Sequence, residues 1–211
     1  MTARGFTTAQ EAQLASLDSP FKVQQYLDSV PYSDDPIYRC PASVLRDRKA
    51  HCFDGAVFAA AALRRLGHPP VLLDQRAVHD DDHVLALYCE HGRYGAVAKS
   101  NFSGLRFREP VFRSLRELVM SYFESFFNIE GEKTLRAYSA PLRLERLDGL
   151  SWETDDGAMD VIADRLDSIR HFPVLSGEME RNLSPVDRRS MAAGLLGVNE
   201  AGLYRPPRDD G

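Results

Sequence analysis

The chain has 211 residues, of which 44% are hydrophobic and 27% are charged, and its formal net charge is −5. This length and balance predict a globular chain built on one core-bearing domain, and the negative charge argues against general affinity for nucleic acid or anionic membranes. The chain has no apolar run near the roughly 20 residues of a membrane span and no signal-like apolar core at its start, so we expect a cytoplasmic protein with no membrane partner.

Two short helices are predicted before the first chemically informative stretch, over residues 7–17 and 21–30. Ser19 is a suitable N-cap for the second, and Pro20 occupies its first position. Residues 46–51 are strongly polar. They suit the lining of a substrate groove and equally a solvated loop.

Cys52 directly precedes an almost uninterrupted apolar segment, residues 53–66, which ends at Gly67 and two prolines. This pattern predicts a buried helix with Cys52 at its positive end. Unpaired N–H groups and the helix dipole stabilise a thiolate there, lowering the thiol pKa from roughly 8.5 toward neutrality. We therefore expect Cys52 to be a nucleophile that reacts faster than Cys40 and Cys89, the alternative being a small core residue.

Apolar runs over residues 71–78, 83–88 and 94–98 predict strands, the last two joined as a hairpin by a turn near His91 and Gly92. His83 opens the first strand of that hairpin. A two-residue turn pairs His83 with Ser100, whereas a three-residue turn pairs it with Lys99 or Asn101. Lysine offers no acceptor for an imidazole N–H and serine constrains the ring less, so Asn101 is the preferred orienting residue.

The loop at residues 79–83 contains two histidines and three aspartates, the composition of a metal site. We expect no metal there, because the loop lies between strands and the histidines do not share a helix face. Its acidity instead favours a protonated His83 beside a thiolate. A metal-binding protein that uses His79 and His83 remains a less favoured alternative.

Farther along, a helix is predicted over residues 111–127, extended structure over 132–144 and an amphipathic helix after Asp155. A final helix is predicted with Ser184 as its cap and Pro185 as its first residue. The aromatic stripe of the 111–127 helix indicates core packing, and we expect no cofactor. The predicted division is a core with N-terminal helices over 1–147, a helical extension of the same domain over 148–204 and a flexible tail over 205–211.

The order of Cys52, Asp54 and Ala56, followed by an Ala-rich helix ending in Leu-Gly and proline, resembles the nucleophile helix of the transglutaminase-like cysteine peptidase superfamily. The resemblance covers residues 41–101. It implies an α+β, papain-like fold with the nucleophile helix packed on an antiparallel sheet and extra helices at both ends. In that family a histidine, then an aspartate or asparagine, follow on the next two strands.

The resemblance implies a catalytic triad of Cys52, His83 and Asn101, and acyl transfer from a peptide or small amide or ester to water or an amine through a thioester on Cys52. The backbone N–H of Cys52 would contribute to an oxyanion hole. Val84 and Leu85 stand where the family commonly has an aromatic residue. A catalytically silent binding module of the same fold is therefore the alternative, and the substrate and oligomeric state are left open.

Overall fold

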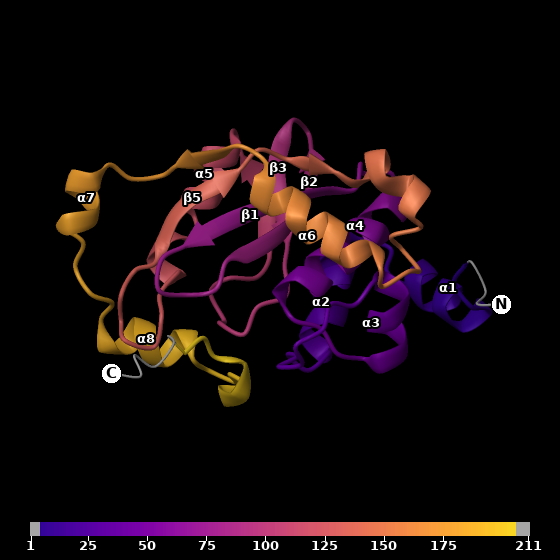
Figure 1. The fold of residues 1–211 in the computed structure, drawn as a ribbon, viewed down its shortest axis with the longest axis horizontal. Helices are drawn as coiled ribbons and strands as arrows, with labels where there is room; N and C mark the ends of the chain where they lie inside the picture. Colours follow the sequence, from indigo (N-terminus) through magenta and orange to yellow (C-terminus); the bar gives the residue numbers. More distant parts are fainter. Residues whose placement is uncertain (1–4, 206–211) are drawn as a thin grey trace.

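Helix α4 (Cys52–Arg65) lies at the centre of the computed structural model, which describes residues 5–205 (Figure 1). The helix begins where Nδ1 of the His51 imidazole accepts the backbone N–H groups of Phe53 and Asp54, at 3.2 and 3.5 Å. The Asp54 carboxylate accepts the His51 N–H in return, completing a capping box. Every residue from 53 to 63 is buried, so the predicted buried helix is confirmed.

Helix α4 packs on a sheet of seven strands, in which every pairing is antiparallel. The strand order is β4-β3-β2-β1-β5-β7, and β6 pairs with β1 beside this path. The predicted α+β class, with this helix on an antiparallel sheet, is confirmed. The strands are β1 (Val71–Ala77), β2 (His83–Glu90), β3 (Arg93–Val97), β4 (Arg108–Phe112), β5 (Leu135–Ser139), β6 (Leu142–Arg143) and β7 (His171–Pro173).

Further helices precede and follow the sheet, as predicted. The first three gather at one end of the molecule, whereas α7 and α8 lie at the other end (Figure 1). Three short 3-10 helices complete the chain at Phe123–Ser125, Leu144–Leu150 and Glu200–Gly202. The other α-helices are α1 (Thr8–Ala15), α2 (Pro20–Ser29), α3 (Pro41–Asp47), α5 (Leu115–Met120), α6 (Ala158–Ser168), α7 (Gly177–Arg181) and α8 (Arg188–Gly194).

Strand β2 is buried on both faces, and its alternating side chains enter two different clusters. Val84, Ala86 and Tyr88 pack with α2, α4 and α6. Leu85 and Leu87 pack with α5 and the aromatic residues that follow it. Because side chains alternate along a strand, His83 belongs to the second face and Val84 to the face that carries α4.

The turn between β2 and β3 has two central residues, His91 and Gly92, with φ of 49° and 72°. Positive φ at both positions defines a type I′ turn, whose twist suits a hairpin. The ladder ends at Ala86 opposite Val97, so its register is the one that pairs His83 with Ser100 when extended. Of the alternatives left open by the sequence, the two-residue turn is the one observed.

Two predicted helices begin later than expected. Residues 108–112 form β4, and α5 starts only after Ser114, whose hydroxyl accepts the N–H of Glu117. Pairing with β3 extends the backbone there, overriding the helical spacing of the apolar residues. Helix α8 is capped not by Ser184 but by Asp187, whose carboxylate accepts the N–H groups of Arg189 and Ser190.

The C-terminal part contributes to the same core as the helices before the sheet. Trp152, Met159 and Ile162 are buried in the cluster that holds α4, and β7 adds a strand that the sequence did not indicate. Most of the predicted tail, from residue 206 onward, lies outside the described residues. Within residues 5–205, no helix has both the length and the apolar character required to cross a membrane.

Candidate active site

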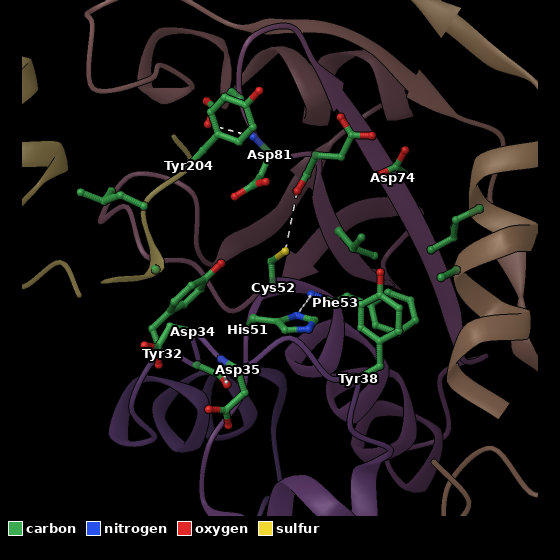
Figure 2. A pocket seen from close by; sticks show the side chains of 18 of the residues that line it. Tyr32, Asp34, Asp35, Tyr38, His51, Cys52, Phe53, Asp74, Asp81 and Tyr204 are labelled. Carbon is green, nitrogen blue, oxygen red and sulfur yellow. Dashed lines mark hydrogen bonds between the residues drawn. The ribbon is translucent and has the colours of Figure 1, made fainter. Parts of the chain in front are cut away.

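Cys52 lies in a cleft of about 700 Å³ at the N-terminal end of α4. Figure 2 shows its sulfur between Tyr32 and Tyr204 on one side and Asp74 on the other. The thiol is half-buried and lies 3.7 Å from the backbone oxygen of Asp82, to which it donates. The structure thus places the predicted nucleophile at the first residue of the helix and inside a cleft large enough for a peptide segment.

The cleft is lined by seven carboxyl groups and, within the described chain, by no lysine or arginine. Burial raises the pKa of the Cys52 thiol to about 12, and the charges of Asp81 and Asp54 contribute to the shift. The expectation of a lowered thiol pKa is therefore wrong for this conformation, because desolvation and carboxylates outweigh the helix N-terminus. The carboxyl groups belong to Asp34, Asp35, Asp74, Asp80, Asp81, Asp82 and Asp167.

The predicted order of cysteine reactivity changes accordingly. At pH 7 we expect iodoacetamide to alkylate Cys89 first, because it is exposed, and Cys52 more slowly, because its thiol is half-buried and protonated. Cys40 should react last, since it is 1% exposed and burial raises its pKa to about 11. Peptide mapping by mass spectrometry over a time course measures all three, and alkylation of Cys52 ahead of Cys89 would contradict the structure.

His83 does not face α4. Its ring is 4% exposed and packs edge-on against Tyr122 and Phe126, on the opposite face of the sheet. Nε2 lies 2.7 Å from the backbone oxygen of Leu105, so this nitrogen carries the proton and donates it to the carbonyl. Nδ1 is then the basic nitrogen, and it has no hydrogen-bond partner in the described part of the chain.

Cys52 and His83 nevertheless line a common small cavity, of about 40 Å³. No hydrogen bond joins the two side chains within residues 5–205. Burial lowers the pKa of His83 to about 4, with the charge of Arg108 acting in the same direction. The expected thiolate–imidazolium pair is thus absent from this conformation, in which both groups are neutral at pH 7.

We expect His83 to stay neutral from pH 8 down to pH 5 in the folded chain, because its pKa is lowered to about 4. The imidazole carbon signal, assigned with His83→Gln, should therefore show no titration in that range by NMR. The unfolded chain protonates this residue at about pH 6.5, so His83 reduces stability as pH falls through the window between the two values. A midpoint at or above 6.5 in the folded chain would contradict this account.

Asn101 lines the same small cavity, but its amide bonds elsewhere. Its Oδ1 accepts the N–H of Asn199 at 2.8 Å, and its Nδ2 donates to the backbone oxygens of Asn199 and Gly202 at 2.9 and 3.1 Å. The structure therefore gives no support to Asn101 as the residue that orients His83. The Leu105 carbonyl holds the ring instead, and Ser100 bonds the Phe102 N–H.

The two histidines of the acidic loop do not come together. His79 bonds Glu132 through Nδ1 at 2.9 Å, while His83 turns into the core. Asp80 accepts the hydroxyl of Thr134 at 2.8 Å, and burial raises its pKa to about 6. Among the residues described, no group of three or more ligating side chains is arranged to hold a metal.

Two side chains that line the cleft, those of Tyr32 and Asp74, and the His171 ring that bonds to Asp74 were not singled out from the sequence. The Tyr32 phenol lies beside Cys52, and burial together with that thiol and Asp81 raises the pKa of Tyr32 well above its ordinary value. Asp74 lines the cleft and accepts from His171 Nε2 at 3.0 Å, and burial raises its pKa. Asp74 could have been noticed in the sequence because it is a charged residue inside the largely apolar run 71–78. No comparable sequence signal marks Tyr32 or His171.

No protein-family model matches the chain, and no curated protein is similar to it. Two solved structures of Legionella pneumophila LapG, one of them EGTA-treated, match 44% of this chain with 18% identity and a TM-score of 0.35. The matched region covers 60% and 59% of those LapG chains, so the chain spans less than two thirds of their length.

Proposed function

We propose that the chain catalyses thiol-dependent acyl transfer, with Cys52 as the nucleophile and a peptide or small amide or ester as the acyl donor. The observation that carries the proposal is the position of Cys52: a thiol at the first residue of a capped 14-residue helix, inside a cleft of about 700 Å³. The Cys52 N–H has no acceptor within residues 5–205, because the first N–H groups of a helix lack intrahelical partners. It is therefore available to an oxyanion.

In the proposed reaction the Cys52 sulfur attacks the carbonyl carbon and the thiol proton passes to Nδ1 of His83. The C–N or C–O bond then breaks, and the same proton leaves with the amine or alcohol. The cavity of about 40 Å³ between the two side chains has room for a water molecule that would relay the proton. Water or an amine finally attacks the thioester and regenerates the thiol.

A catalytically silent binding module is the second candidate. One specific observation supports it: the His83 ring lies on the sheet face opposite α4, where its Nε2–H donates a hydrogen bond to the Leu105 carbonyl. Such a module would bind a peptide in the cleft without forming a covalent intermediate. The carboxyl lining disfavours an anionic ligand in either case.

Hydrolysis of p-nitrophenyl esters of short acyl peptides, followed by release of p-nitrophenol, tests the proposal. The rate should fall to that of the uncatalysed reaction in Cys52→Ala, because no other thiol lines the cleft. Cys89→Ala is the matched control, since Cys89 is exposed on β2 and should leave the rate unchanged. Equal rates for the chain and Cys52→Ala would favour the binding module.

A further inference from the structure

The last described segment of the chain lies against the cleft. We call residues 199–204 the C-terminal strap. Ala201, Gly202, Leu203 and Tyr204 line the cleft of about 700 Å³ that holds Cys52. Gly202 and Tyr204 also line the small cavity shared by Cys52 and His83, so the strap forms the wall on that side of the thiol.

One side chain, that of Asn101, holds the strap, and it does so by hydrogen bonds to the strap's backbone. The Asn101 amide receives one backbone N–H and donates to two backbone oxygens of the strap, as described above, so its oxygen and its nitrogen are both engaged. A fourth hydrogen bond runs from the Asn199 side-chain Nδ2 to the Tyr32 backbone oxygen at 3.1 Å. Backbone recognition of this kind accepts many sequences, because it reads the main chain and not the side chains.

Gly202 is the point at which the groove selects a side chain. A Cβ atom there would lie 2.9 and 3.1 Å from two carbons of the Tyr32 ring and 3.5 Å from Asn101 Nδ2. Tyr32 is itself the neighbour of Cys52. The groove between Tyr32 and Asn101 therefore accepts glycine and excludes larger residues at this position.

The strap can separate from the groove without unfolding the helix before it. Helix α8 is fastened independently, by Ser103 N–H to the Gly194 oxygen at 2.9 Å and by close packing of Gly194 on Phe127. Gly197, with φ of +75°, lies between the helix and the strap and can absorb a change of backbone direction. No residue of the strap belongs to either buried apolar cluster of the described chain, so opening exposes little apolar surface.

We propose that the groove between Tyr32 and Asn101 is a peptide-binding subsite next to Cys52, which the chain's own C-terminal strap fills in cis. A substrate or ligand peptide occupies the groove when the strap leaves, with its backbone on Asn101 and a glycine against Tyr32. The assignment of that peptide as an acyl donor rests on the proposed function, whereas occupancy of the groove does not. Asn101 is in this account a positioning residue for the peptide.

The test compares the rate of Cys52 alkylation in three proteins: the unaltered chain, a chain truncated after Val198, which lacks the strap, and the Gly202→Val variant, in which the strap is displaced. Both changes should accelerate Cys52 alkylation by about tenfold or more, because they remove or displace the wall beside the thiol and the hydrogen bonds that hold it. Gly149→Val is the matched control, since no atom lies within 4 Å of a Cβ there. The exposed Cys89 normalises reagent reactivity, and the buried Cys40 reports any unfolding.

The synthetic peptide Asn-Glu-Ala-Gly-Leu-Tyr, which has the sequence of the strap, should restore protection of Cys52 in the truncated chain at a concentration of a few mM, about the effective concentration of a short tethered segment. The same peptide carrying Gly202→Val should not protect. Unchanged Cys52 alkylation on truncation, or equal protection by both peptides, would overturn the proposal. Protection by the glycine peptide without any ester hydrolysis would keep the subsite and reject only the acyl transfer.

Discussion

Replacement of Arg39 by methionine should lower the free energy of unfolding by about 3–5 kcal/mol. The Arg39 side chain is 6% exposed and contacts three carboxylates. It donates to Asp47 at 3.1 Å, lies 3.8 Å from the fully buried Asp54 and also pairs with Asp35. Methionine fills the volume but leaves the Asp54 charge without a counterion in the core, and that uncompensated charge is the main source of the loss.

The loss should be larger at pH 8 than at pH 5. Burial raises the pKa of Asp54 to about 7 even with Arg39 present, and removing the arginine raises it further. A folded state that binds more protons than the unfolded state loses stability as pH rises. Urea unfolding at both pH values measures this, with Arg46→Met as the control because the Arg46 side chain is 62% exposed. Similar losses of stability for the two variants would contradict the conclusion that Arg39 is the counterion of the buried Asp54.

Gly55→Ala should destabilise the chain by about 2–3 kcal/mol, although alanine favours a helix over glycine by about 1 kcal/mol. A Cβ at Gly55 would lie 2.2 Å from the Lys99 Cβ, so α4 and the segment that follows β3 would have to separate. Lys99 cannot turn aside, since it is 6% exposed and its Nζ donates to the backbone oxygens of Leu27, at 2.8 Å, and Val30.

Gly149→Ala is the matched control for this substitution, because a Cβ there meets no atom within 4 Å. Thermal or urea unfolding should show the loss only for Gly55→Ala. A stability equal to or above that of the unaltered chain would mean that α4 and the segment that follows β3 are farther apart than the structure shows. It would also remove the argument that α4, and with it Cys52, is fixed in position by close packing.

The parts of the fold that could be predicted are those specified by local sequence. The buried helix follows from an apolar run bounded by Gly67, and the hairpin follows from the turn residues His91 and Gly92. Three registers were compatible with the sequence, because the turn length cannot be read from residue types alone. In the structure His91 and Gly92 both have positive φ, which defines a two-residue turn and therefore fixes the register of the hairpin.

The orientation of His83 could not be predicted, for a physical reason. Residues 84–88 are apolar or aromatic at every position, so the two faces of β2 are equally suited to burial. Alternation places His83 and Val84 on opposite faces but does not say which face receives α4. In the structure α4 packs on the face that carries Val84, so His83, the first residue of β2, shares with Cys52 only the small cavity of about 40 Å³.

The role of Asn101 could not be predicted from the sequence, for a different reason. Its partners, Asn199 and Gly202, lie 98 and 101 residues away along the chain. The hairpin register suggested that Asn101 lies beside His83. In the structure, contacts with the distant residues Asn199 and Gly202 engage both the oxygen and the nitrogen of the Asn101 amide. The raised pKa of the Cys52 thiol could not be predicted for a similar reason, since the desolvation and the charge of Asp81 that raise it come from tertiary packing.

Mass spectrometry of the chain truncated after Val198, both intact and after digestion to peptides, tests thiol-dependent acyl transfer most directly. After mixing with the p-nitrophenyl ester of acetyl-Asn-Glu-Ala-Gly and acid quenching, we expect one acyl group per chain, located on the peptide that contains Cys52. The adduct should decay as product forms and should be absent from Cys52→Ala. An unmodified chain that still binds the glycine peptide, or an adduct placed on Cys89, would contradict the assignment of Cys52 as the nucleophile.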